Sequence, residues 1–425
     1  MLVAVFMLFV IGAMAALSID VVTLYTARSE AQLAADAAAL AAARVLANSG
    51  ATSDTVGASM GVAQARASAV ATQVAEQNQV GGAYLTALNI TAISFGGTLI
   101  PANPTVTVTV QKADLPTFFA RIWGRTTIAV SASATAEVYN PSPSPLGAPT
   151  NPPLPVAPIC VKPWLLPNIS PNPGPVNPRI FDPAAGTILD TNLLGWETPN
   201  GPGNKLRTDC TPTTCSANSA PTAWRYYPGT TDPAGDFPAP SASSCTGCGA
   251  FNNFQLSIAG CVQTPISCSS PAANPVHIDQ TPDGGRDAEA AQAVDSLTHS
   301  VGNGGDSVDT ATGTNPPFQF LAGTENPVVL SGSLAAGADV MVSDSLVTVP
   351  VINVDTGTTV PLPGFPNVYI IGFVQLFLSP TGQPVPGSNH IHTQVINLVG
   401  CGTALAGQPI LGNGASPVAV RLISP

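Results

Sequence analysis

The sequence predicts an α+β protein with a long N-terminal transmembrane and periplasmic helix, a helix-ββαβ module, a Pro-rich linker and a disulfide-tied, mostly β ectodomain. Three observations predict this fold class: the first 19 residues carry no charge, all eight cysteines follow residue 159, and Val/Ile-rich runs bounded by Gly and Pro dominate the last hundred residues. The expected segments are an anchor at 1–27, a helical and α+β module at 28–139, a Pro-rich linker at 140–159, a Cys-rich acidic irregular region at 160–310 and a β-rich C-terminal domain at 311–425.

Low charge sets the chain apart from an ordinary soluble protein. Only 9% of the 425 residues are charged, against 45% hydrophobic, whereas a typical soluble chain carries about a quarter charged residues. The net charge of −11 is concentrated after residue 139, and no segment offers a basic patch. These features argue against nucleic acid as a partner.

The first element is an apolar run at residues 1–19, MLVAVFMLFVIGAMAALSI, which continues after Asp20 to Ala27. About 20 such residues cross a hydrocarbon core of roughly 30 Å as a helix. A cleaved signal peptide and a buried core helix are the alternatives. Ala13-Met14-Ala15 resembles a cleavage site, but the basic segment of a signal peptide is missing. We therefore expect a retained membrane anchor.

The same helix is expected to continue through Ser29 to Ala47, because Ala, Leu, Glu, Gln and Arg dominate that stretch. Asn48-Ser49-Gly50 supplies a stop. Its Ala-lined face would let another helix approach closely. Alternatively, the alanines reflect helix propensity alone.

The apolar span is followed by an acidic, an aromatic and a basic residue and then by AADAAALAAA at 34–43. The residues of this pattern are Asp20, Tyr25, Arg28, Ala34, Ala35, Asp36, Ala38 and Ala42. Together they resemble the N-terminal signature of the TadG-like proteins of Flp (Tad) pilus assembly. The resemblance covers roughly residues 1–139, and LVTVPVINVDTG (346–357) and VYIIGFVQLFL (368–378) more weakly resemble the C-terminal part of some relatives.

The module after the long helix is predicted from its periodicity. A second helix is expected from Thr55 to about Gln79, with Asp54 as N-cap. Strands are expected at 88–95, 106–110 and 128–134, where apolar residues alternate with polar ones. A short helix at 116–124 lies between the last two strands, and its aromatic residues are expected in the core: Phe118, Phe119 and Trp123.

The cysteines predict a disulfide framework in an oxidising compartment, which places the C-terminal bulk outside the cytoplasm. They are Cys160, Cys210, Cys215, Cys245, Cys248, Cys261, Cys268 and Cys401. We expect local pairs at 210/215, 245/248 and 261/268, with Cys160–Cys401 as a long tie. The CxxC at 245–248 could instead belong to a zinc or redox site.

Two groups of residues have the chemistry of metal ligands. Asp279, Asp283 and Asp287 lie in a Gly/Pro-rich acidic stretch, which continues to Asp306 and Asp309 and suits calcium. His390 and His392 would point the same way on one strand. Neither group matches a complete ligand set, so solvated acidic surface and strand-surface histidines are the simpler interpretations. No metal or cofactor is assigned.

The C-terminal hundred residues are expected to form a small sandwich or barrel. Its strands are expected at 328–330, 339–342, 346–354, 368–378, 390–398 and 418–423.

No catalytic constellation is recognised in the sequence. Gly57-Ala58-Ser59-Met60-Gly61 has the letters of a nucleophile elbow, but the required strand does not precede it. We therefore expect no enzymatic activity.

The resemblance implies a single-pass protein of the bacterial inner membrane. Its role would be structural, in pilus assembly or anchoring, and its N-terminal helix would contact Tad/Flp pilus or secretion components. The alternatives are a filament-incorporated, pilin-like subunit and an anchored metal-binding or adhesive module.

Overall fold

The structure is a computed structural model that confirms the α+β class. Its first compact unit comprises Met1–Leu46, Gly61–Tyr139 and Val420–Pro425, and its second comprises Ala47–Met60 and Asn140–Ala419. The residues described are 2–54, 59–97, 103–142, 156–168, 170, 179–196, 206–207, 227–228, 250–263, 265–268, 276–277, 286–299, 304–309, 315–353, 367–379, 390–401, 408–409 and 416–424.

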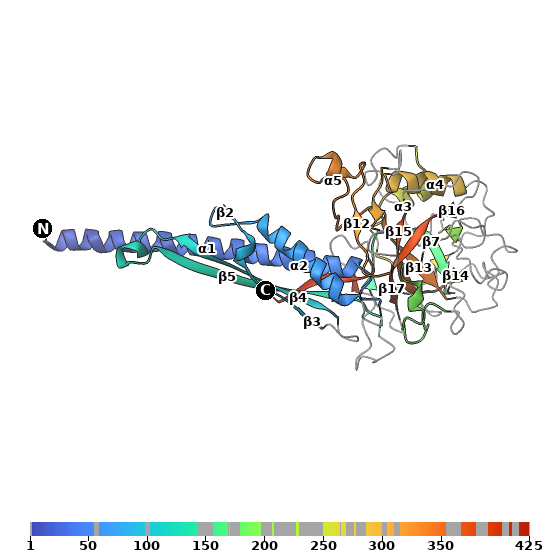
Figure 1. The fold of residues 1–425 in the computed structure, drawn as a ribbon, viewed down its shortest axis with the longest axis horizontal. Coiled ribbons are helices and arrows are strands. Elements are labelled where there is room, and N and C mark those ends of the chain that lie inside the picture. Colours follow the sequence, from blue (N-terminus) through green and yellow to red (C-terminus); the bar gives the residue numbers. More distant parts are fainter. Residues whose placement is uncertain are drawn as a thin grey trace. The chain divides into compact units, whose positions relative to one another are not determined.

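The predicted long helix is present as α1 (Leu2–Asn48), which has 47 residues and is drawn in blue in Figure 1. At 1.5 Å per residue it is about 70 Å long. It ends where expected, because Gly50 adopts a left-handed φ of 79°. A Cβ at Gly50 would lie only 2.7 Å from the Ile396 carbonyl oxygen, so this position requires glycine.

The second helix, α2 (Met60–Glu76), begins five residues later than predicted, and residues 55–58 lie outside the described part. Ala63, Ala67 and Val70 are buried, and their spacing of four and three residues places them in one apolar stripe of the helix.

The first unit contains a four-stranded sheet in the order β19-β5-β4-β3. Burial alternates along β4 and β5, so Val106 and Val108 are fully buried. On the other face the Thr107 and Thr135 hydroxyls lie 2.9 Å apart in a cross-strand pair. The strands are β3 (Ile90–Gly96), β4 (Thr105–Pro116), β5 (Thr127–Tyr139) and β19 (Ala419–Ser424).

The turn between β4 and β5 differs from the prediction. A 3₁₀-helix, η2 (Ala120–Trp123), replaces the expected α-helix. Phe118 is 64% exposed, so its predicted place in the core is wrong. The reason is its position, since a single turn beyond the last strand pair, Pro116↔Thr127, has no sheet left to pack against. Phe119 is half-buried.

The second unit is built on one five-stranded sheet, in the order β17-β15-β13-β7-β9, in place of the expected sandwich or barrel. β7 runs parallel to β13, with Leu166 beside Val351, so the boundary expected at 310/311 falls inside one compact unit. The strands are β7 (Trp164–Pro167), β9 (Tyr227–Pro228), β13 (Leu346–Ile352), β15 (Ile370–Leu378) and β17 (Thr393–Gly400).

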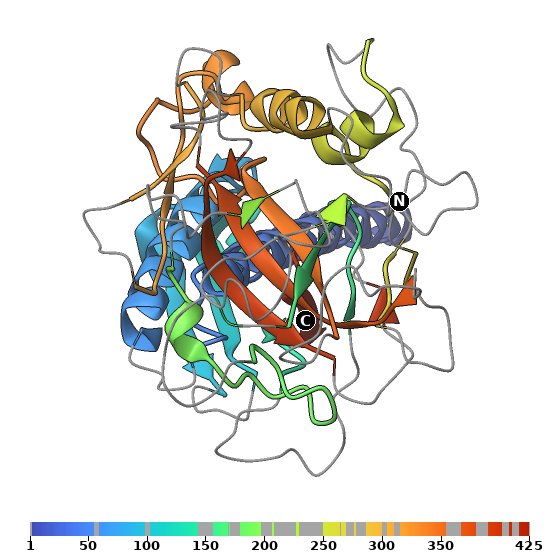
Figure 2. The same cartoon turned by 90° about the vertical axis from the view of Figure 1, so that its right-hand side faces the viewer.

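Both faces of this sheet are covered, because every residue of β15 is buried. α3 (Asn253–Ala259) and α4 (Arg286–Leu297) lie along one side of the strands (Figure 2) and contribute to the larger apolar core. A smaller cluster, which includes Phe318, Phe320 and Phe377, forms a second core.

Two predicted C-terminal strands are wrong. Residues 328–330 belong to a short helix, α5 (Pro327–Leu330), because Pro stands in its first turn and the Asn326 side chain accepts the Val328 N–H. Residues 339–342 make only an isolated bridge, between Asp339 and Leu321.

The remaining elements are short. Paired strands are β1 (Gln79–Val80) with β2 (Ala83–Tyr84), β6 (Val156–Ala157) with β18 (Gln408–Pro409), β8 (Leu206–Arg207) with β16 (His390–Ile391), β10 (Val276–His277) with β14 (Asn367–Val368), and β11 (Ser307–Val308) with β12 (Phe320–Leu321). The other 3₁₀-helices are η1 (Ala87–Asn89) and η3 (Thr191–Leu193).

Candidate functional site

The N-terminal half of α1 exposes apolar side chains in all directions. Val3, Leu8 and Tyr25 are each more than 70% exposed. Within the described part of the chain, α1 is the one helix that is long and apolar enough to cross a membrane. A helix that is apolar all round suits lipid, so the feature is consistent with a membrane anchor.

From Ala27 onward the same helix has a buried face of small residues within the first unit. Its fully buried members include four signature alanines: Ala34, Ala35, Ala38 and Ala42. The neighbouring face contacts the chain's own strands, because Gln32 Nε2 donates to the Ser133 carbonyl oxygen at 3.3 Å. These alanines are therefore occupied within the chain, and the exposed apolar surface of α1 lies mainly before Ala27.

The charged signature residues have three different settings. Arg28 is exposed, and Asp36 accepts a hydrogen bond from Gln32 Nε2 at 2.8 Å. Asp20 is only 6% exposed, although it stands directly after the uncharged run of residues 1–19.

Asp20 binds the end of the β4–β5 hairpin. Its Oδ1 accepts the Phe118 N–H at 2.8 Å, and its Oδ2 accepts the N–H groups of Phe119 at 3.0 Å and Ala120 at 2.9 Å. Three successive amides pointing at one carboxylate form an anion-binding nest at the start of η2. Figure 1 shows this hairpin end beside α1. A carboxylate at the end of an apolar span is costly unless it is satisfied, and here the hairpin satisfies it.

The contact between Asp20 and the hairpin end has no signature in the local sequence. A lone acidic residue after an apolar run signals that some partner must exist. The partner's identity was not readable, because the donors are backbone N–H groups about a hundred residues away in the chain.

Inside the second unit, the last turn of α1 is capped by the side chain of Asn397, which is fully buried. Asn397 Nδ2 donates to the Ala47 carbonyl oxygen at 2.7 Å and to Gln375 Oε1 at 2.6 Å, and Asn397 Oδ1 accepts from Ser53 Oγ at 3.2 Å. Helix C-termini leave carbonyl groups without helical partners, so strand β17 supplies a donor that α1 lacks.

The loop after α1 is bound to the same strand. Ser53 Oγ accepts the Leu398 N–H at 3.0 Å and donates to the Leu398 carbonyl oxygen at 3.1 Å. Asn48 Nδ2 donates to the Met341 carbonyl oxygen at 2.9 Å. The end of α1 is therefore an integral part of the second unit's polar core.

Two disulfides are present among the described residues, and they correct the expected pairing. Cys160 pairs with Cys261, and Cys268 pairs with Cys401, so the expected 261/268 and 160/401 pairs are wrong. Sequence proximity favoured the local pair, but the backbone brings distant segments together, since the Cys160 N–H donates to the Val262 carbonyl oxygen. The other four cysteines lie outside the described residues: Cys210, Cys215, Cys245 and Cys248.

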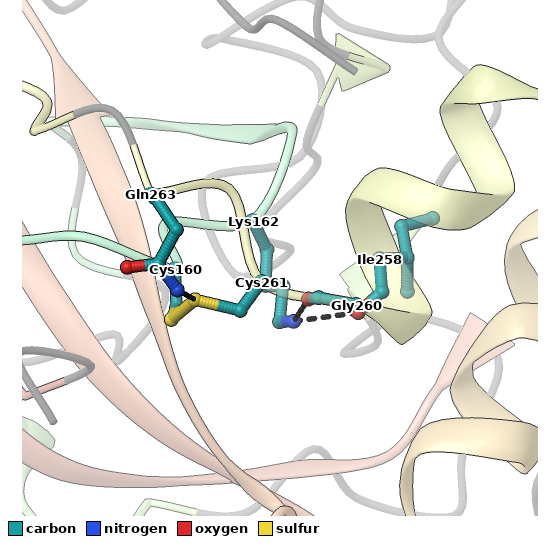
Figure 3. The surroundings of a disulfide bond; sticks show 6 residues. All are labelled: Cys160, Lys162, Ile258, Gly260, Cys261 and Gln263. Atoms are coloured by element: carbon teal, nitrogen blue, oxygen red, sulfur yellow. Dashed lines mark hydrogen bonds between the residues drawn. A yellow bond between two sulfur atoms is a disulfide. The ribbon is translucent and has the colours of Figure 1, made fainter. Parts of the chain in front are cut away.

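A buried lysine lies next to the first disulfide (Figure 3). Lys162 is 4% exposed, and its Nζ donates to the carbonyl oxygens of Ile258 at 2.5 Å and Gly260 at 2.8 Å. These carbonyls belong to the C-terminal end of α3, where a cation is favourable. Burial lowers the pKa of Lys162 to about 7, while the charge of Asp344 opposes the shift. The group fastens α3 to the sheet.

The acidic metal candidates fall partly outside the described residues. Asp279 and Asp283 lie outside them, and Asp287 is in α4 but its side chain is not described. Asp306 is buried and accepts from Asn326 Nδ2 at 2.9 Å and Ser343 Oγ at 2.6 Å. Its carboxylate therefore holds loops together.

The histidine candidates are not on one continuous strand. His390 belongs to β16, whereas His392 lies between β16 and β17. The alternation that predicted a common direction does not apply to them, and the side chain of His390 lies outside the description. Among the residues described, no three His, Cys, Asp or Glu side chains group closely enough to hold a metal ion.

The serine of the nucleophile-elbow candidate makes local hydrogen bonds. Ser59 is buried, and its Oγ donates to Asp54 Oδ2 at 2.8 Å while its N–H donates to the same oxygen at 3.1 Å. Ser59 directly precedes α2, as a helix-start residue does.

Comparison with known proteins bears on the anchor. Residues 1–45 match the sequence model of the Tad family, described as Flp pilus-assembly TadE/G-like. The N-terminal segment is a TadE/G-like domain. This domain implies a role in Flp/Tad pilus assembly, and it confirms the resemblance for the matched residues. The extension of that resemblance to residue 139 and to 346–378 stays a prediction.

No curated protein and no solved structure matches the chain. The TadE/G-like helix and the disulfides together indicate a single-pass envelope protein with an extracytoplasmic domain.

Proposed function

We propose that this protein is a structural component of Flp/Tad pilus assembly, anchored in the bacterial inner membrane with its C-terminal bulk outside the cytoplasm. The observation that carries the proposal is that one helix, α1, combines two surfaces. The TadE/G-like residues 1–45 include both the exposed apolar surface before Ala27 and the Ala face that is buried after it.

The physical role of the protein is to tether its C-terminal bulk to the membrane and to position it there. α1 runs without a break from the apolar segment to Asn48, and its last turn is capped by Asn397 in the disulfide-tied unit. Lipid or Tad components can contact the exposed apolar residues, whereas the folded units occupy the rest of the helix. We further propose that the protein acts without catalysis.

Membrane fractionation tests the anchor. The full chain is expressed in a bacterium with a Tad system, and membranes are extracted with alkaline carbonate. Wild type should stay in the membrane and its C-terminal bulk should be digested by protease added to spheroplasts. Leu8→Arg/Ile11→Arg should be released, since each Arg near the centre of the span costs about 3 kcal/mol.

The matched control is Leu88→Arg, because Leu88 is 92% exposed and lies outside the anchor. It should stay membrane-bound. The proposal is contradicted if carbonate extracts the wild-type chain. It is also contradicted if protease digests the C-terminal bulk only after the inner membrane has been permeabilised.

Shearing the cells separates this function from that of a filament subunit. An assembly or anchoring component remains with the membranes, and piliation is lost when its gene is deleted. Co-sedimentation of the chain with sheared filaments would instead identify a pilin-like subunit.

A further inference from the structure

The end of the β4–β5 hairpin has an unusual composition for a turn. This hairpin end, Thr117–Thr126, reads TFFARIWGRT, with two arginines and no acidic residue. Turns are ordinarily built from Gly, Asn, Asp, Ser and Pro. Aromatic residues mixed with arginine are instead typical of the interface between a membrane and water.

An aromatic side chain and both arginines of the hairpin end are exposed. Phe118 is 64% exposed, and Arg121 and Arg125 are exposed as well. Among the described residues, neither guanidinium has an ion-pair partner. The backbone of the hairpin end is closed, because Thr117 N–H donates to the Thr126 carbonyl oxygen at 3.2 Å and Gly124 adopts a left-handed φ of 82°. An ordered turn thus presents an aromatic ring and two cations.

Asp20 sets the height of this turn on α1. Its carboxylate accepts N–H groups from Phe118, Phe119 and Ala120, so the hairpin end lies beside residue 20. The uncharged run ends at residue 19, and 19 helical residues measure about 28 Å, close to the hydrocarbon thickness of a bilayer. The hairpin end therefore lies at the level of the lipid headgroups if α1 spans the membrane.

We propose that the hairpin end is a second membrane contact, in which Phe118 enters the interfacial layer while Arg121 and Arg125 bind lipid phosphates of the same leaflet. The inference rests on the proposed function, since it needs α1 in the bilayer. Continuity with the anchor, the +2 charge of the segment and the exposed ring all favour phospholipid over another protein as the occupant.

Quenching by brominated lipid tests the contact. The full chain is reconstituted into vesicles of phosphatidylethanolamine and phosphatidylglycerol. In the brominated vesicles, a quarter of the lipid molecules carry bromine at carbons 6 and 7 of one acyl chain. Phe118→Trp adds a reporter at the hairpin end. Leu88→Trp is the matched control, because Leu88 is an exposed apolar residue beside Ile90, whose partner Val110 is about 20 Å along β4 from the turn.

The added emission of Phe118→Trp should shift to shorter wavelength and lose at least half its intensity in brominated vesicles, whereas that of Leu88→Trp should be unaffected. Arg121→Glu/Arg125→Glu in the Phe118→Trp background should reduce the quenching at least twofold, because two acidic residues are repelled by phosphatidylglycerol. Circular dichroism checks that these surface variants keep the fold.

Carbonate extraction of the same vesicles separates the two proposals. A chain that resists extraction but shows no quenching at position 118 overturns the second contact and leaves the anchor standing; the hairpin end would then face water or a protein. A chain that carbonate extracts overturns both.

Discussion

Removing the Cys268–Cys401 disulfide should destabilise the second unit more than any local bridge could. The bond joins residues 133 apart in sequence, and the perturbation is the double variant Cys268→Ala/Cys401→Ala. Cross-linking a chain removes loop-closure entropy from its unfolded state, by an amount that grows with the logarithm of loop length. For this separation the loss corresponds to about 5 kcal/mol at 25 °C.

The size of the effect distinguishes the observed pairing from the local one. A bridge between Cys261 and Cys268 would close a loop of roughly seven residues and contribute only about 2.4 kcal/mol. The Cys160–Cys261 bond, with a separation of 101, should contribute nearly as much as Cys268–Cys401. The two double variants should therefore lose similar stability.

Guanidinium denaturation of the full chain in detergent micelles provides the assay. Trp164 is buried in the larger core of the second unit, so its contribution to the emission reports on that unit's unfolding. Mass spectrometry of a non-reduced digest identifies the linked peptides directly. A 261–268 peptide pair, or a loss near 2 kcal/mol for Cys268→Ala/Cys401→Ala, would refute the reasoning.

Three further predictions concern polar groups, of which Asn397 and Lys162 are buried and His299 is partly exposed. Asn397→Leu should lower the free energy of unfolding by about 3–5 kcal/mol. The Ala47 carbonyl and the other buried partners lose their hydrogen bonds to Asn397, and each buried group left unsatisfied costs about 1–3 kcal/mol. Asn192→Leu, at an exposed position, should change the free energy of unfolding by less than about 0.5 kcal/mol in the same denaturation assay. Burial lowers the pKa of Lys162 to about 7, so above pH 7 the unfolded state binds more protons than the folded state. The free energy of unfolding should therefore rise by about 1.4 kcal/mol per pH unit from pH 7.5 to 9. Lys162→Met should abolish this slope, and a slope that persists in the variant contradicts the assignment of the lowered pKa to Lys162. The hydrogen bond to Asp344 at 3.0 Å raises the pKa of His299, so its stabilising contribution is present below its ordinary pKa and is lost as pH rises through the raised value; NMR titration should show Asp344→Asn returning the pKa of His299 toward its ordinary value.

Several features were predictable because they are written in local patterns. The uncharged run at 1–19, the Ala-rich stretch at 34–43 and the stop at Gly50 predicted α1 to its end. Alternation of valine and threonine predicted β4. Helical and strand periodicities repeat over a few residues, so a single sequence displays them.

Other features required the folded chain. The partners of Asp20 and Asn397 are separated from them by about 100 and 350 residues, and the cysteine pairs join segments that the pattern of spacing kept apart. Phe118 was placed in the core from its helical spacing, although its exposure depends on where the sheet ends.

The sequence by itself determined that this protein has a long apolar N-terminal helix whose residues 1–45 resemble TadE/G-like proteins, strands with alternating apolar residues after it, and cysteines confined to the region beyond residue 159. The tertiary structure alone decided which groups meet. The hairpin end donates hydrogen bonds to Asp20, strand β17 caps the last turn of α1, and Cys268 forms a disulfide with Cys401. The physical reason is that composition and periodicity act over neighbouring residues. Satisfying a buried carboxylate, carbonyl or thiol depends on which distant segment the fold brings within about 3 Å.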